Sequence, residues 1–170
     1  MERKWGARFA ALAIALALSF GAEAEPVTKV AFLGVQFLND HEGEEPTTDA
    51  ERARLAALAA AFQAKLEASG HYAFVAVPLA IQKQIDAGAV IGNCGGCEFQ
   101  YGAKLGSDRV AWLVVQKVSN LILNLNVYFG DVPGHKLTFV HSVDIRGDTD
   151  ESWSRGLTYL VKNYMLPAAP

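Results

Sequence analysis

The two cysteines of the chain stand three residues apart, in the segment Asn93-Cys94-Gly95-Gly96-Cys97-Glu98. Cysteines at this spacing can form a disulfide, exchange disulfides with a partner, or supply thiolates to a metal. Covalent haem attachment needs a histidine directly after the second cysteine, and Glu98 stands there instead. A zinc site needs two more ligands, and no second cysteine pair or nearby histidine supplies them. We therefore predict neither a metal nor a cofactor at Cys94 and Cys97.

Two interpretations of the pair remain open at the level of sequence. As a structural disulfide it would close a very small ring, which stabilises a fold by only about 2 kcal/mol and mainly fixes the local loop. As a redox pair it would benefit from the helix expected to begin at Cys97, because the positive end of a helix favours a thiolate. The motif does not follow an early strand, as it does in the thioredoxin order of elements.

A second group of polar residues marks a candidate binding face. The alternation over 121–129 and 136–146 is typical of antiparallel strands with one wet side. Asparagine is uncommon in strands, yet two asparagines fall on the outward-facing positions. The predicted face comprises Gln116, Asn124, Asn126, Tyr128, Ser142, Asp144 and Arg146. The alternative is a solvent-facing sheet side that carries cross-strand polar pairs and binds nothing.

Five strands and four helices are expected to position these groups. The apolar patterns predict strands over residues 27–37, 72–77, 109–118, 121–129 and 136–146. Helices are predicted over 49–69, 79–87 and 97–105, with a last helix after Asp148. We expect an α+β fold, a two-layer sandwich in which a mixed sheet of about five strands ends in an antiparallel meander and helices lie mainly on one face.

Two helix starts carry capping signals. Thr48 and Glu51 have the spacing of a capping box, in which each side chain bonds the backbone amide of the other residue. Asp148 is predicted to cap the last helix, with Glu151 at its third position. Trp112 and Trp153 fall on apolar faces and are expected in the core.

The first residues resemble a secretory signal peptide. Arg3, Lys4 and Arg8 precede an apolar run of about a dozen residues, and Ala22-Glu23-Ala24 is typical of a cleavage site. We expect residues 1–24 to be removed and residues 25–170 to form a single globular domain, periplasmic or secreted. No later stretch is long and apolar enough to cross a membrane.

Charge and motifs narrow the function classes. Without the three basic and two acidic residues of the first 24 positions, 12 Lys and Arg remain against 16 Asp and Glu, a formal charge of −4. This balance argues against nucleic acid, whose binding depends on phosphate neutralisation. The chain contains no Gly-x-Ser-x-Gly, P-loop, Gly-x-Gly-x-x-Gly or His-Glu-x-x-His motif. These absences favour a protein that is not an enzyme.

Two resemblances add to this picture. The segments CGGCEFQYGAKLGSDRVAWLVVQKVSNLILNLNV and SVDIRGDTDESWSRGLTYLVKN are similar to an uncharacterised family of small secreted bacterial proteins, a domain of unknown function. That family implies an association with periplasmic quinoprotein alcohol-oxidation systems. The opening strand, the helix pattern and the late meander resemble, in architecture alone, the amino-terminal domain of TolB, which implies protein binding without catalysis.

The sequence therefore predicts a non-enzymatic binding or accessory module whose partner is another periplasmic protein, and the family resemblance implies a partner in an envelope or quinoprotein oxidation system. Thiol–disulfide exchange at Cys94 and Cys97 is one alternative. A small-molecule or metal chaperone is the other.

Overall fold

The computed structural model describes residues 26–166, so the predicted signal peptide at residues 1–24 lies outside the described part. The elements follow the expected order, and their bounds agree with the sequence patterns to within a few residues. They are β1 (Thr28–Asn39), α1 (Asp49–Glu67), β2 (Tyr72–Phe74), α2 (Leu79–Ala87), α3 (Cys97–Lys104), β3 (Arg109–Ser119), β4 (Ile122–Asp131), β5 (Lys136–Arg146), α4 (Asp150–Leu160) and the π-helical turn η1 (Val161–Met165).

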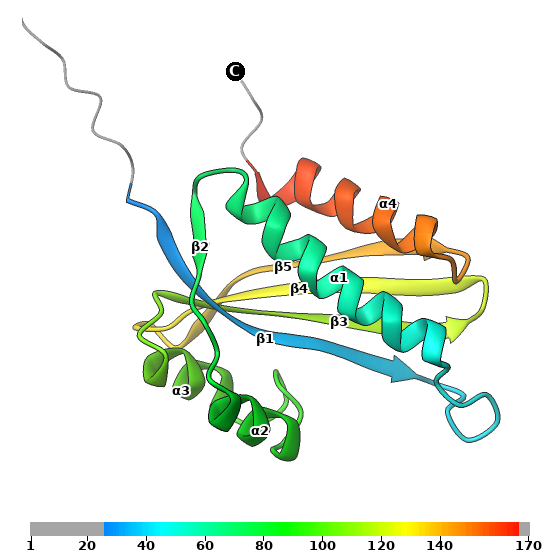
Figure 1. The fold of residues 1–170 in the computed structure, drawn as a ribbon, viewed down its shortest axis with the longest axis horizontal. Coiled ribbons are helices and arrows are strands. Elements are labelled where there is room, and N and C mark those ends of the chain that lie inside the picture. The colour runs from blue at the N-terminus through cyan, green and yellow to red at the C-terminus, as the bar shows by residue number, and fades with distance from the viewer. Residues whose placement is uncertain (1–25, 167–170) are drawn as a thin grey trace, which may run out of the picture.

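The five strands form one mixed sheet in the order β2-β1-β3-β4-β5. β1 runs parallel to both β2 and β3, whereas β3, β4 and β5 form the predicted antiparallel meander (Figure 1). β1 is shifted in register between Phe32 and Val35, beside Gly34, whose φ of +106° favours glycine. The α+β prediction is confirmed.

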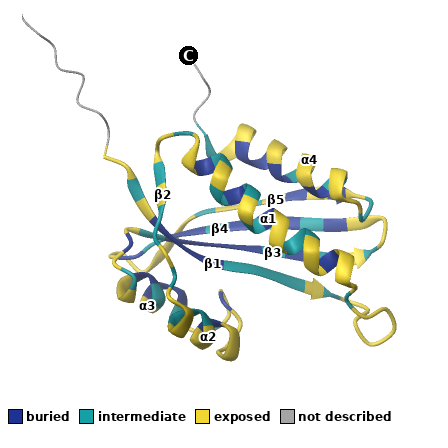
Figure 2. Cartoon of the chain, viewed as in Figure 1, coloured by how far each residue is buried: buried dark blue, intermediate teal, exposed yellow. Residues whose placement is uncertain are grey.

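The two faces of the sheet are covered differently. α1 and α4 pack side by side across one face, where Phe62, Leu125 and Trp153 belong to the larger apolar core (Figures 1 and 2). α2 and α3 lie at one end of the opposite face, where Trp112, Phe99 and Ile91 form a second, smaller core. The two longest helices thus share one face, and both Trp112 and Trp153 are buried as predicted.

The start of α1 follows the predicted capping box. The Thr48 hydroxyl accepts a hydrogen bond from the Glu51 amide, and the Glu51 carboxylate accepts one from the Thr48 amide. The prediction for α4 is wrong by one residue, because Thr149 caps the helix by accepting from the Ser152 amide. Asp148 is instead turned towards the interior, where it accepts a hydrogen bond from the Trp153 indole.

The close approach of α3 to the sheet depends on a glycine. A Cβ added at Gly102 would lie 2.5 Å from Val110 Cγ1 and 2.6 Å from Val132 Cγ2, closer than any side chain allows. This contact fixes the position of α3, and therefore of the cysteines at its start, against β3. Among the residues 26–166, no helix is long and apolar enough to cross a bilayer.

Candidate functional site

The predicted polar residues lie together on the sheet face opposite α1 and α4. In the register of the strands, Gln116 is beside Asn124, and Asn124 is beside Asp144. The next row joins Val114, Asn126 and Ser142, and the third joins Trp112, Tyr128 and Val140. Arg146 continues the set beside Ile122. We call this surface, from β1 to β5, the open face.

The open face mixes polar groups with exposed apolar side chains. Val140 is 53% exposed, Leu38 on β1 is 45% exposed and Ile122 is 39% exposed. Tyr128 is half-buried because its ring stacks on Trp112, with centroids 5.0 Å apart. Among the described elements, α3 contacts β1 and β3 and, through Phe99, the end of β4 at Gly130. The outward side chains of β5 at Val140 and Ser142 are exposed, and those of β4 are partly buried.

Charged residues stand at the border of the open face. Arg146 forms an exposed ion pair with Asp144 at 2.8 Å. At the opposite border Gln116 donates to Asp40 at 3.2 Å. Asn126 donates from Nδ2 to the Val114 carbonyl, which holds its side chain along the sheet. The middle of the open face therefore carries amide side chains, and its exposed apolar and charged side chains lie towards the borders.

The covered face contains a buried ion pair that the sequence analysis missed. Lys117 Nζ lies 2.7 Å from Glu51 Oε1, and the side chains are 5% and 1% exposed. Lys117 follows Leu113 and Val115 at alternate positions of β3, and alternate residues of a strand share one face. This alternation was the signal that could have predicted a buried Lys117 side chain. The pair joins the first turn of α1 to the end of β3.

The ionisation of this pair follows from its contacts. Burial alone would raise the pKa of Glu51, but hydrogen bonds from Lys117 and Thr48 outweigh it and lower the pKa to about 2. The hydrogen bond to Glu51 likewise raises the pKa of Lys117 above its ordinary value, against the effect of burial. Both residues are therefore charged at neutral pH, and the pair serves structure.

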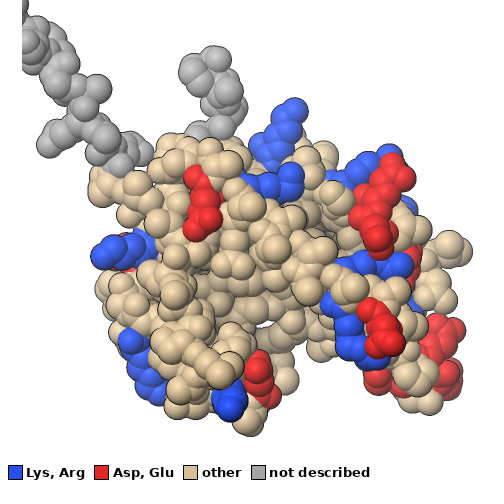
Figure 3. Space-filling view, viewed as in Figure 1, with Lys and Arg blue, Asp and Glu red and all other residues tan. Residues whose placement is uncertain are grey.

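A second ion network joins α1 to α4. Arg54 Nη1 lies 3.0 Å from Asp148 Oδ1, and Arg54 Nε donates to Asp150 at 2.7 Å. The hydrogen bond to Asp150, aided by the charge of Asp148, raises the pKa of Arg54. Figure 3 shows basic and acidic side chains gathered over the end of the molecule where α1 begins.

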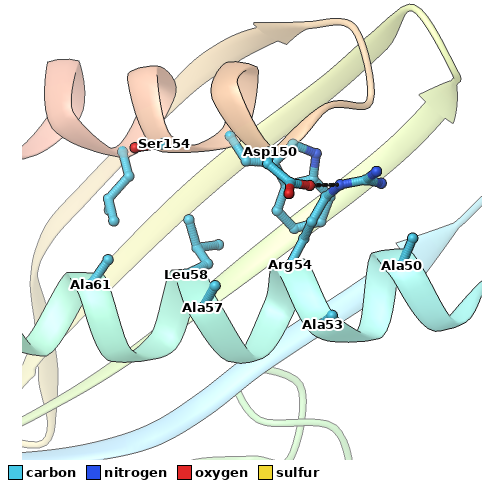
Figure 4. Close-up of a pocket in the computed structure, with 10 residues that line it drawn as sticks. Ala50, Ala53, Arg54, Ala57, Leu58, Ala61, Asp150 and Ser154 are labelled. Atoms are coloured by element: carbon cyan, nitrogen blue, oxygen red, sulfur yellow. Dashed lines mark hydrogen bonds and ion pairs between the residues drawn. The ribbon is translucent and has the colours of Figure 1, made fainter.

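A shallow pocket of about 380 Å³ lies between α1 and α4. Figure 4 shows Ala50, Ala53, Ala57 and Ala61 along one wall, with the Arg54–Asp150 pair above them. The small side chains of α1 leave this space between the two helices. Apart from the Arg54–Asp150 pair, most of the residues that line the pocket are apolar.

The cysteines at the start of α3 form a disulfide between Cys94 and Cys97. Gly96, with φ of +94°, precedes the helix, so Cys97 occupies its first position. The loop before them is anchored independently: Ile91 is buried, and its carbonyl accepts a hydrogen bond from Gln36 at 2.9 Å. Gly92 lies against Trp112, where an added Cβ would be 3.1 Å from the indole.

Glu98 is the residue of this region whose importance the sequence analysis missed. It is only 7% exposed, and its Oε2 lies 3.0 Å from Cys94 Sγ. Its place directly after the Cys-x-x-Cys motif, in the first turn of a short helix followed by buried Phe99, was the available signal. Cys94, Cys97 and Glu98 also bring their ligand atoms within 4.8 Å of one another.

A comparison with protein families identifies the family of this chain. Residues 28–165 match the family DUF3280, described as "Protein of unknown function (DUF2380)". The match spans most of the chain, so the protein belongs to this family, as the resemblance of the cysteine segment and the carboxy-terminal segment predicted. No curated protein matches the sequence.

Several solved structures are similar in architecture. Lipoprotein GNA1162 from Neisseria meningitidis has 12% identity and a TM-score of 0.48, with 82% of this chain and 99% of that chain covered. The LpoB C-terminal domain from Salmonella enterica has 11% identity and a TM-score of 0.47 over 74% and 87% of the two chains. TolB from Acinetobacter baumannii has 13% identity and a TM-score of 0.47, with 82% of this chain and 29% of TolB covered. TolB, expected from the order of elements, is thus among the similar structures.

Proposed function

We propose that this chain is an exported binding module that contacts another protein of the cell envelope through the open face. The observation that carries the proposal is the unequal covering of the sheet. One face lies beneath α1 and α4, whereas on the other face α2 and α3 cover only one end and the described residues leave the outward side chains of β5 exposed and those of β4 partly exposed. The proposed contact residues are those predicted from the sequence, with Val140 and Leu38 added by the structure.

The composition of the open face fits a protein partner better than a small ligand. A small-molecule site is normally concave and encloses most of its ligand. The rows of β3, β4 and β5 instead form an extended surface that carries a stacked aromatic residue, Tyr128, and an exposed valine, Val140, on the edge strand β5. Interfaces draw much of their binding energy from a few aromatic and apolar groups with polar residues around them.

Site-specific photo-crosslinking tests this proposal. A photo-reactive amino acid is placed at Val140 or Ser142 on the open face, and at Ala60 on the exposed side of α1 as the matched control. We expect both open-face positions to give an adduct with the same envelope protein and the control position to give none. The substitution Val140→Lys should then reduce the yield of the adduct formed from position 142, without changing the thermal stability of the protein.

Two results would contradict the proposal. Adducts of equal yield from Val140 and Ala60 would indicate non-specific proximity. The absence of an adduct from both open-face positions would show that the open face does not bind a partner. If the recovered partner belongs to a quinoprotein oxidation system, the finer assignment implied by the family resemblance is supported.

The alternative of a metal chaperone has one structural observation behind it, the grouping of Cys94, Cys97 and Glu98. Cysteine binds metals as a thiolate, and a disulfide contains no thiolate. The Cys94–Cys97 disulfide would therefore have to be reduced before this site could bind a metal. Native mass spectrometry of the reduced protein with Zn²⁺ is the test. A reduced protein that stays free of metal contradicts this alternative.

A further inference from the structure

The contact between Glu98 and Cys94 needs a chemical explanation that binding does not give. Glu98 Oε2 lies 3.0 Å from Cys94 Sγ, and no other hydrogen bond or ion pair of this carboxyl group is found within residues 26–166. A sulfur in a disulfide carries no proton, so Cys94 cannot donate across this contact while it is bonded to Cys97. In the oxidised protein any hydrogen bond here must use a proton of the carboxyl group.

The same contact becomes an ordinary hydrogen bond when the disulfide opens. A Cys94 thiol has an S–H group that can donate to the carboxylate of Glu98. The two atoms are therefore placed to pass a proton between them when the Cys94–Cys97 bond breaks or forms.

A structural disulfide does not by itself require this carboxyl group, although an acidic side chain in the first turn also suits the dipole of α3. Burying an ionisable group without a charged partner is unfavourable, and each such group in a native protein calls for an explanation. Glu98 is 7% exposed, and the described residues place no basic side chain in an ion pair with it. The loop is already held by buried Ile91, by its hydrogen bond from Gln36 and by buried Phe99.

The disulfide can also be reached from outside. Cys94 and Cys97 are half-buried, and Gly95 between them is exposed. A Cβ added at Gly95 would meet no atom within 4 Å, so open space lies beside the bond. A partner thiol has room to approach, as disulfide exchange requires.

We propose that Cys94 and Cys97 are a thiol–disulfide exchange pair and that Glu98 is the catalytic residue that gives and takes the proton of Cys94. This activity is separate from the open face and does not depend on the proposed function. The co-reactant is a dithiol, presented by another protein in the cell and by dithiothreitol in the test.

The exchange proceeds in two balanced steps. A thiolate of the dithiol attacks Cys97 Sγ, so that the leaving sulfur is Cys94 Sγ, which lies 3.0 Å from the proton donor Glu98. The Cys94–Cys97 bond breaks, its electron pair goes to Cys94 Sγ, and this sulfur takes the proton from Glu98. The second thiol of the co-reactant then loses its proton, which returns to Glu98 through solvent. The resulting thiolate attacks the other sulfur of the co-reactant, the one bonded to Cys97 in the mixed disulfide.

That second attack releases Cys97 as a thiolate at the start of α3, where the helix dipole favours it, and a proton from solvent restores the thiol. The protein has gained two electrons and two protons, and the co-reactant has become a disulfide. In the reverse direction the Glu98 carboxylate removes the Cys94 proton and makes this sulfur the attacking thiolate.

The experiment compares the rate of reduction by dithiothreitol in the folded protein and its variants, read by alkylation of the released thiols and mass spectrometry. Glu98→Gln keeps the shape of the side chain but cannot exchange the proton. We expect its rate to fall on the order of 100-fold, the usual size of a general acid–base contribution. Glu151→Gln is the matched control, because Glu151 holds the same position in α4 and is exposed, and its rate should equal the wild-type rate.

A second variant separates proton transfer from structural support. Glu98→Ala should be equally slow, and added formate should restore part of its rate, since a small carboxylic acid can replace the missing group. Thermal unfolding of oxidised Glu98→Gln should be unchanged or shifted upwards. Faster reduction together with a lower melting temperature would show that Glu98 only supports the loop, and would overturn the proposal.

Two further outcomes also overturn it. A wild-type disulfide that resists dithiothreitol until the protein unfolds removes the exchange activity altogether. Equal rates of reduction for wild type and Glu98→Gln would show that Glu98 does not transfer the proton, even if the reduction is fast. Neither result bears on the proposed binding of a partner by the open face.

Discussion

Lys117 Nζ lies 2.7 Å from Glu51 Oε1, in a contact where both side chains are almost completely buried. Glu51 also closes the capping box with Thr48, so one carboxylate joins the start of α1 to the end of β3. A buried ion pair is costly to form, but removal of one partner leaves an uncompensated charge in the interior. The first two predictions concern this pair.

Acid should destabilise the protein through Glu51. The ordinary pKa of a glutamate is 4.5, and the folded protein lowers that of Glu51 to about 2. As the pH falls, the unfolded chain binds the proton first, so the stability that Glu51 contributes is present above pH 4.5 and is lost as the pH falls towards 2. The full loss is about 3 kcal/mol.

Urea unfolding of wild type and Glu51→Gln at several values of pH between 2 and 6 measures this effect. The free energy of unfolding should fall less steeply with acid in the variant, because the other carboxylates are common to both proteins. Parallel curves would contradict the assignment.

Substitutions at the two partners should not be additive. Glu51→Gln retains the capping box but leaves the Lys117 charge unpaired, and Lys117→Met leaves the Glu51 charge unpaired. Each single change should cost about 3–5 kcal/mol of unfolding free energy. The double variant should be more stable than the sum of the two losses predicts, because no buried charge remains. Guanidinium unfolding of all four proteins gives the coupling energy, and a value near zero would argue against a direct interaction.

The two aspartates that contact Arg54 should differ in importance. Asp148 is 13% exposed, accepts a hydrogen bond from the Trp153 indole and forms an ion pair with Arg54, whereas Asp150 is 90% exposed. Asp148→Ala leaves the indole N–H without its acceptor and removes the less exposed of the two carboxylates that pair with Arg54, so it should cost about 2–4 kcal/mol. Asp150→Ala should cost under about 1 kcal/mol, as expected for an exposed pair.

Thermal unfolding of these two aspartate variants checks the difference, and near-ultraviolet circular dichroism reports whether Trp153 keeps its environment. Equal losses for the two substitutions would mean that the indole contact contributes nothing.

Much of the fold was predictable from local patterns. Alternation along β4 and β5 identified the meander and its outward polar side, because successive side chains in a strand point to opposite faces. The Thr48–Glu51 spacing identified the start of α1, since capping uses groups within one helical turn. The same reasoning failed at α4, where Asp148 and Thr149 are both cap-forming residues and aspartate is the better cap by type. Tertiary contacts decided between them, as Arg54 and Trp153 hold Asp148 inwards.

The sequence by itself determined the order of the elements, the family and the short separation of the two cysteines, because these depend on near neighbours in the chain. Only the tertiary structure decided that Lys117 meets Glu51 across 66 residues and that Gln116, Asn124 and Asp144 share one row. It also decided that Glu98 turns its carboxyl group to Cys94. A helix residue can face solvent or core, and the packing of α3 against β3, which Gly102 permits, selects the face.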